Sequence, residues 1–159
     1  MWLNERRNQM SNRKAVKKIL LIIAFTLIVM QFLQPARNFN GQVSSDISSV
    51  ITIPNDLSNL LSNACYDCHS NQTNYPWYSY IQPFGWMIEN DISRGKEKLN
   101  FSEWANLSVR KQKSKMREIR NIIQEGKMPL KSYKLLHPEA CLTNEKKELI
   151  VSWTESAYN

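Results

Sequence analysis

The sequence is poor in glycine, with four among 159 residues, and no long stretch of it alternates polar with apolar side chains. The alternation expected of half-buried β-strands is therefore missing. Helix-forming residues are plentiful instead, and there is no internal repeat. The sequence predicts an all-α fold with one modest domain.

Acidic residues are nearly missing from the first forty positions, which hold seven basic side chains against Glu5 alone. This segment accounts for most of the net charge of +7, because the remaining 119 residues carry fourteen basic and thirteen acidic side chains. A nucleic-acid site would need its positive charge on the folded part of the chain, which is close to neutral. Nucleic-acid binding is therefore not predicted.

No charged residue lies between Lys18 and Arg37, and Ile19–Met30 is almost wholly apolar. The run is short for a spanning helix, which needs about 20 apolar residues, whereas a signal-peptide core needs about 7 to 15. However, no small-x-small cleavage site follows, and no nearby cysteine could carry a lipid. A retained anchor is therefore favoured over a cleaved signal, which remains the alternative.

The boundaries follow from this interpretation. Residues 1–18 are predicted as a basic cytoplasmic N-terminus, 19–34 as a transmembrane anchor, 35–55 as a polar linker and 56–159 as the functional domain. Because basic residues precede the apolar run, the positive-inside rule would place that domain across the membrane from the cytoplasm.

Helical periodicity recurs through the predicted domain. An apolar stripe from Leu57 to Cys68 leads into a cysteine motif, and Pro83 can start a helix that Gly95 would stop. A further helix is predicted over about 109–125, between Ser108 as N-cap and Gly126 as stop. The last helix is predicted to begin after Thr143 and to bury Leu149, Ile150 and Trp153.

Residues Cys65-Tyr66-Asp67-Cys68-His69 form a C-x-x-C-H motif, which is typical of c-type haem attachment. The two thiols of such a motif add to the vinyl groups of the porphyrin as thioethers. The adjacent histidine then becomes the proximal ligand of the iron. The sequence therefore predicts one covalent haem c, attached through Cys65 and Cys68, with His69 as the proximal iron ligand.

Two other uses of these cysteines stay open. A redox or structural C-x-x-C pair would usually belong to a βαβ unit, which this sequence lacks. Zinc is the sharper alternative, because His137 and Cys141 could complete a four-ligand site with Cys65 and Cys68, although zinc gives no reason for His69. Cys141 is itself predicted to be buried, with an exposed thiol or an intermolecular disulfide as the alternative.

Met128 lies in a non-helical stretch, Gly126-Lys127-Met128-Pro129-Leu130, from which a loop can direct its sulfur toward the iron. It is predicted as the distal ligand. His137 is the main alternative, and Met87 and Met116 are less favoured alternatives. With both axial positions filled, the protein would be an electron carrier and not an enzyme. An open distal position would instead indicate a haem-based sensor or a peroxidase-like enzyme.

Two clusters of side chains carry weaker signals. Aromatic residues between positions 75 and 86 are predicted to form core and to wall the porphyrin. Basic residues between positions 110 and 120 are predicted to form a solvated helix face, with docking of an acidic redox partner as the alternative. The aromatic residues are Tyr75, Trp77, Tyr78, Tyr80, Phe84 and Trp86, and the basic ones are Arg110, Lys111, Lys113, Lys115, Arg117 and Arg120.

Several strings together resemble one known family. They are Cys65-Tyr66-Asp67-Cys68-His69-Ser70-Asn71, Asn74-Tyr75-Pro76-Trp77-Tyr78, Ile81-Gln82-Pro83, Leu99-Asn100-Phe101-Ser102-Glu103, Met128-Pro129-Leu130 and Tyr133. The chain resembles the single-haem, N-terminally anchored "haem-binding domain" proteins of Gram-negative bacteria, which are c-type cytochrome-like. The resemblance covers nearly everything after the apolar run.

The resemblance implies haem attachment at Cys65, Cys68 and His69, with Met128 at the family's Met-Pro position. It also implies a small cytochrome c-like domain in the periplasm, tethered to the inner membrane as a single-pass protein. It implies no particular reaction and names no redox partner. Cys141 departs from the polar or charged residue expected at that position.

Overall fold

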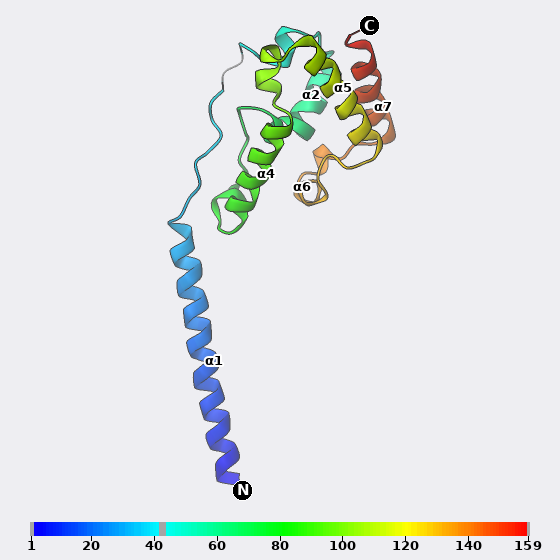
Figure 1. Cartoon of the computed structure of the whole chain (residues 1–159). Coiled ribbons are helices and arrows are strands. Elements are labelled where there is room, and N and C mark those ends of the chain that lie inside the picture. Colours follow the sequence, from blue (N-terminus) through cyan, green and yellow to red (C-terminus); the bar gives the residue numbers. More distant parts are fainter. Residues whose placement is uncertain (1, 42–43, 159) are drawn as a thin grey trace. The chain divides into compact units, whose positions relative to one another are not determined.

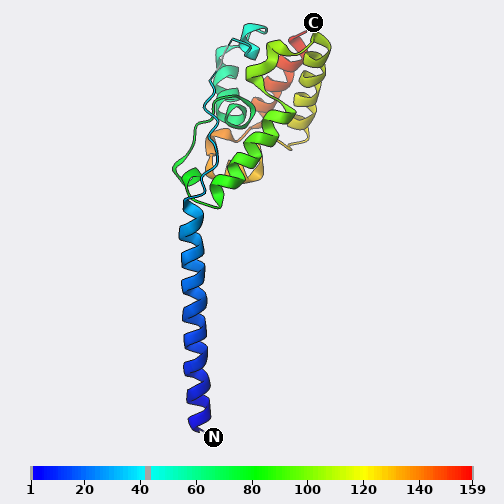
Figure 2. The ribbon, with the colours of Figure 1, turned by 60° about the vertical axis from the view of Figure 1, so that its left-hand side comes forward.

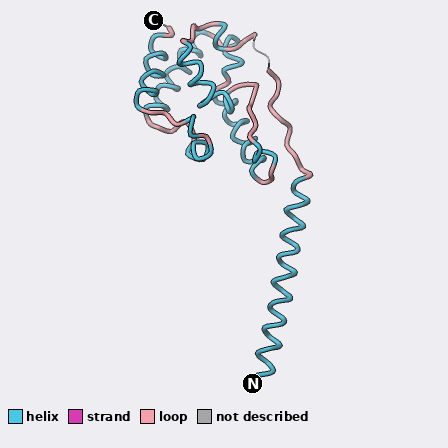
Figure 3. The backbone as a smooth tube through the Cα atoms, turned by 180° about the vertical axis from the view of Figure 1, so that it is seen from behind, coloured by secondary structure: helices cyan, strands magenta, loops and turns pink. Residues whose placement is uncertain are grey.

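The computed structural model describes residues 2–41 and 44–158, with side chains from residue 12 onward. Helices and loops make up this described chain, and its strand-like pairing is limited to one bridge between Phe39 and Gln72 (Figure 3). The predicted all-α class is thus confirmed. Arg6 and Arg7 of the predicted basic N-terminus lie outside the residues whose side chains the structure describes.

The elements comprise α-helices, most of which are labelled in Figure 1, and short 3₁₀ or π turns, which are given η labels in the text. They are α1 (Trp2–Gln31), η1 (Ile47–Ser49), α2 (Asn55–Leu61), η2 (Ser62–Tyr66), α3 (Asp67–His69), η3 (Trp77–Tyr80), α4 (Phe84–Lys98), η4 (Phe101–Asn106), α5 (Val109–Gln124), α6 (Lys131–Leu136), η5 (Pro138–Ala140) and α7 (Asn144–Ser156). The chain divides into two compact units, Met1–Ala36 with Pro76–Glu89, and Arg37–Tyr75 with Asn90–Asn159.

The predicted transmembrane helix over 19–34 is wrong. Within the described part of the chain, no helix combines the length and the apolar character needed to cross a membrane. The helix ends at Gln31, so its uncharged part from Ile19 covers only about 20 Å, against about 30 Å for a bilayer core. Extending it backward brings in Lys17 and Lys18. The predictions of an inner-membrane partner and of a single-pass protein with a periplasmic domain are wrong for the same reason.

In the first unit, η3 and the start of α4 bind the C-terminal end of α1. The backbone N–H of Gln82 donates to Oε1 of Gln31 at 2.9 Å, and the indole N–H of Trp86 donates to the Leu33 carbonyl at 2.8 Å. Trp77 is 76 % exposed, and Tyr80 and Phe84 are exposed as well. The prediction that these aromatic residues form core is therefore wrong for these three.

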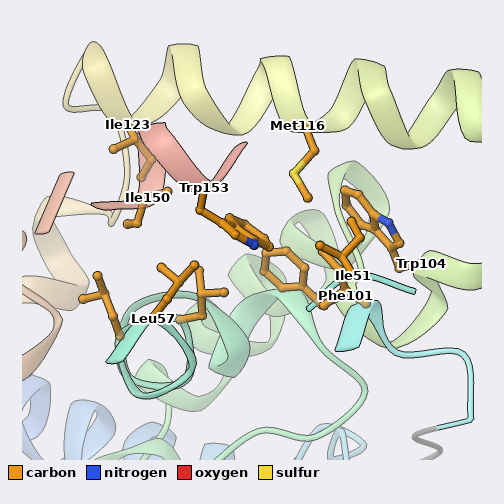
Figure 4. Packing of buried hydrophobic residues seen from close by; sticks show 11 residues of the cluster. Ile51, Leu57, Phe101, Trp104, Met116, Ile123, Ile150 and Trp153 are labelled. Atoms are coloured by element: carbon orange, nitrogen blue, oxygen red, sulfur yellow. The ribbon is translucent and has the colours of Figure 1, made fainter. Parts of the chain in front are cut away.

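The core of the second unit lies where α5 and α7 pack side by side (Figures 1 and 2). Met116 and Ile123 project from α5 toward Ile150 and Trp153 of α7 (Figure 4). Each such side chain contributes roughly 1.5–3 kcal/mol when fully buried. The rest of the cluster is Ile47, Ile51, Leu57, Leu60, Leu61, Phe101 and Trp104, of which Ile47 and Ile51 come from the segment predicted as a linker.

The C-terminal end of α5 and the start of α7 agree with their sequence signals, whereas Ser108 holds the N-cap position of α5 without a side-chain cap hydrogen bond. Gly126 follows α5 at φ 65°, and the N–H groups of Gly126 and Lys127 donate to the carbonyls of Ile123 and Ile122, the pattern of a Schellman stop. At the start of α7, the Thr143 hydroxyl accepts from the Lys146 N–H. Both predicted helices are confirmed, and Ile150 and Trp153 are buried as predicted, but Leu149 is exposed, so its predicted burial is wrong.

Candidate functional site

The C-x-x-C-H motif continues the helix that begins with α2. Leu57, Leu60 and Leu61 of α2 are buried in the core, which fixes the direction of the helix. The next turn, η2, is a wider π turn that contains Cys65, and α3 follows directly with Cys68 and His69. Such π turns often occur at functional sites. The buried leucines thus hold the three motif residues in a fixed orientation.

His69 is oriented by a backbone group. Its Nδ1 lies 2.9 Å from the carbonyl oxygen of Leu99, and because a carbonyl only accepts, Nδ1 carries the proton. Burial lowers the pKa of His69, so the imidazole is neutral near pH 7. A neutral ring with a protonated Nδ1 leaves the Nε2 lone pair available, which is what a metal ligand requires.

The two motif cysteines are free thiols and partly buried. Burial is the main cause that raises the pKa of each thiol to about 12, so both are protonated at neutral pH. The smaller electrostatic contributions come from Cys68 for Cys65, and from Asp67 and Asp91 for Cys68. Gly95 of α4 lies against Cys68, and a Cβ at position 95 would stand 2.5 Å from the Cys68 carbonyl oxygen. The prediction that Gly95 ends its helix is wrong, because α4 continues to Lys98. Glycine is needed there for the close approach of α4.

The two residues between the cysteines tie the motif to the domain. The Tyr66 ring stacks on Phe101 with 5.1 Å between centroids, and its hydroxyl lies 3.4 Å from the Asp46 carboxylate. The Asp67 carboxylate accepts from the Asn74 N–H at 3.0 Å and from the Tyr133 hydroxyl at 2.7 Å. These contacts anchor both side chains to the rest of the domain, and Asp67 also borders the second of the two cavities described next.

Two adjoining cavities border the motif, with volumes of about 270 Å³ and 280 Å³. Ala64, Cys65, His69, Lys98 and Met128 line both of them. The first has mainly aliphatic walls, and the second adds Cys68 and the polar edge of α4. The further aliphatic wall residues of the first are Leu61, Leu99, Ile119, Ile122, Ile123 and Ile150.

Met128 is half-buried and packs against the core, so the loop after Gly126 brings it to the same cavities as His69. His137 lines neither of these cavities. Its Nδ1 lies 3.0 Å from Oε1 of Glu139, and its ring stacks on Tyr133 with 4.1 Å between centroids. The structure therefore brings Met128 together with the motif and does not bring His137 there.

The geometry of the described side chains does not support the zinc alternative for the cysteines. Among the side chains of residues 12–41 and 44–158, no three from His, Cys, Asp or Glu come close enough to hold a metal ion. Cys65, Cys68, His137 and Cys141 are all described, so the four-ligand zinc arrangement is not formed. Cys141 is exposed, and the prediction that it is buried is wrong.

Three contributors to the site were not identified from the sequence. They are the Leu99 carbonyl, the close approach at Gly95 and the Phe101 ring, which also lies edge-on to His69 at 6.4 Å. A glycine within an otherwise helical pattern also indicates a packing contact, so the sequence at Gly95 was compatible with a close approach as well as with a helix stop. The Leu99 carbonyl is a backbone group and leaves no sequence signal.

The residues present fit an apolar cofactor that contains iron: two thiols, a neutral imidazole and a thioether border the two cavities, the first of which has mainly aliphatic walls. Fold and site thus define a small helical cofactor-binding protein. The sequence profile of the Haem-binding domain family matches residues 25–156, so the chain belongs to that family and binds haem. Searches among curated proteins and among solved structures gave no match.

The contact at Gly95 leads to a testable expectation. Gly95→Ala would place a Cβ against the Cys68 carbonyl, so α4 or the motif must shift. Overpacking of this kind costs about 1–3 kcal/mol, and we expect a loss of that size in the free energy of unfolding together with weaker haem retention. Urea unfolding and the haem-to-protein absorbance ratio measure the two effects. Ser93→Ala, on an exposed position of α4, should change neither.

Proposed function

We propose that this protein carries one haem c, attached covalently through Cys65 and Cys68, and that it transfers single electrons. In this proposal His69 is the proximal ligand of the iron and Met128 is the distal ligand. The bound haem supplies the chemistry, which is the one-electron exchange between ferric and ferrous iron. The protein would be a carrier and not a catalyst.

The observation that supports this proposal best is the shared lining of the two cavities. Cys65, His69 and Met128 border both cavities, and Cys68 borders the second. These four are the side chains that covalent attachment and two axial bonds would require. Three of them lie within the five-residue motif, whereas Met128 comes from the loop after α5, so the fold is needed to bring it to the other three.

Each residue has a physical role in the proposal. The Leu99 carbonyl holds His69 in the tautomer whose Nε2 can bind iron, and it raises the basicity of that nitrogen. The aliphatic walls exclude water, and a thioether ligand stabilises ferrous iron more than a second imidazole would. Both effects raise the reduction potential.

A sensor or peroxidase-like enzyme is supported less well, because Met128 lines both cavities and can fill the distal position, although the second cavity also holds Asp91, Arg94 and Glu97. Such proteins need an open or displaceable distal position, and a peroxidase also needs polar groups that act on bound peroxide. Lys98, Lys115 and Glu118 are the charged side chains of the mainly aliphatic cavity. Lys115 and Glu118 form a salt bridge with each other at 2.7 Å.

The direct test is mass spectrometry of the protein produced in a cell that assembles haem c. We expect the mass of the polypeptide plus one haem, and we expect this mass to persist after denaturation and acid-acetone extraction. Oxidised and reduced absorption spectra, with and without carbon monoxide, then report the axial ligands. An apo mass, or stoichiometric zinc, would refute the proposal.

A further inference from the structure

We propose that Tyr133 is a positioning residue, which fastens the segment carrying Met128 to the haem-attachment motif. The inference rests on the proposed function, because it concerns how the distal ligand is kept in place. Tyr133 lies on α6, five residues after Met128, and it lines the second cavity together with Met128 and Cys68. Its hydroxyl donates to Oδ2 of Asp67 at 2.7 Å.

Asp67 is a firm point of attachment, because it lies within the motif itself. Its Oδ1 accepts the N–H of Asn74 at 3.0 Å, and its backbone carbonyl accepts the hydroxyl of Thr73 at 2.6 Å. The residue after it is Cys68 and the next is His69. The bond from Tyr133 therefore joins the Met128 segment directly to the helix that presents the proximal histidine.

The Tyr133 ring is held in place on its other side as well. The imidazole of His137 stacks on it at 4.1 Å with an interplanar angle of 12°, and His137 is in turn 3.0 Å from the Glu139 carboxylate. A second, longer contact joins the Tyr133 hydroxyl to the Asn63 carbonyl at 3.4 Å. The hydroxyl is thus aimed at the motif by packing, and the bond costs little rotational freedom.

Besides the packing of Met128 against the core, hydrogen bonds attach the Met128 segment at its two ends. At its start, Gly126 and Lys127 are bonded to the last turn of α5, as described above. At its end, the first residue with a side-chain bond to the motif is Tyr133. Without the Tyr133 hydroxyl, the segment would keep the first attachment and lose the second, so the thioether would leave the iron more often.

The test compares Tyr133→Phe with the unmutated protein after both have been loaded with haem. A hydrogen bond to a charged group is lost, and we expect carbon monoxide to bind about tenfold more readily to the ferrous protein. The weak sulfur-to-iron charge-transfer band of the ferric protein should decrease. The covalent haem mass should be unchanged, since no attachment residue is altered. A purely structural role would lower the melting temperature without moving the band.

Two further variants keep the test decisive. Asp67→Asn removes the charged acceptor. If Tyr133 and Asp67 act through one bond, the double variant with both substitutions should increase carbon monoxide binding no more than the stronger single variant does. Tyr158→Phe is the matched control, because its hydroxyl also makes two hydrogen bonds, to Gln112 and Trp104, and borders neither haem cavity. It should leave the band and carbon monoxide binding as they are.

The outcomes separate this inference from the proposed function. If the unmutated protein holds a thioether-bound haem with the charge-transfer band, and Tyr133→Phe changes neither the band nor carbon monoxide binding, the positioning role is overturned. If the unmutated protein has covalent haem but no such band, Met128 is not the ligand and the inference is overturned with it. If it carries no covalent haem, the proposed function fails first.

Discussion

Replacing Cys65 and Cys68 together with serine is expected to leave no haem on the polypeptide after acid-acetone extraction. Serine keeps the size of each side chain but cannot form a thioether, so the attachment is lost while the cavity remains. Noncovalent haem can still bind through His69, and its absorbance would disappear on denaturation. Intact mass before and after extraction measures the effect, which is expected to be complete.

The third cysteine provides the matched control. Cys141 is exposed and borders neither cavity, so Cys141→Ser should keep the full covalent haem mass. Each single variant of the motif should retain one thioether at reduced yield. Haem that remains attached in the double variant would show that Cys65 and Cys68 are not the attachment residues.

The parts of this fold that could be predicted are those whose signals are local. The helix over α5 has its apolar stripe, its N-terminal serine and its terminal glycine within twenty positions, so each signal reinforces the others. The last helix likewise begins where Thr143 caps it. The C-x-x-C-H motif is equally local, since its chemistry fixes its spacing.

The predictions that were wrong concern features that depend on contacts between distant residues. Gly95 has the sequence signature of a helix stop, yet the approach of α4 to Cys68 overrides it. Trp77 and Phe84 are large and aromatic, which favours burial on average, yet they are exposed, while the ring next to the motif is Phe101. No pattern within a short window distinguishes these cases.

The transmembrane prediction for the apolar run after Lys18 was wrong for a different reason. The run was already short for a spanning helix, and because α1 ends at Gln31, its uncharged part cannot be lengthened without including Lys17 and Lys18. Gln31 and Leu33 accept hydrogen bonds from Gln82 and Trp86, more than fifty positions away. Contacts with such distant partners leave no local signal.

Met128→Ala is expected to change the iron site more than any other single substitution that leaves the haem attached. Without the thioether, the ferric haem should shift toward high spin and the sulfur-to-iron charge-transfer band should vanish. If Met128 occupies the iron in about 99 of 100 molecules, its removal raises the apparent affinity for carbon monoxide about a hundredfold. The reduction potential should fall, because thioether ligation favours ferrous iron. Absorption spectra and a carbon monoxide titration measure these changes.

His137→Ala separates the two candidate distal ligands. His137 borders neither cavity and stacks on Tyr133, so its removal should leave the spin state and the charge-transfer band unchanged. A small rise in carbon monoxide binding would be consistent with a looser Tyr133 ring and would remain far below that of Met128→Ala. If His137→Ala instead gives the high-spin spectrum, the histidine is the ligand. If the unmutated protein already binds carbon monoxide readily, the distal position is open, and the sensor or peroxidase-like alternative then explains the site better than electron transfer does.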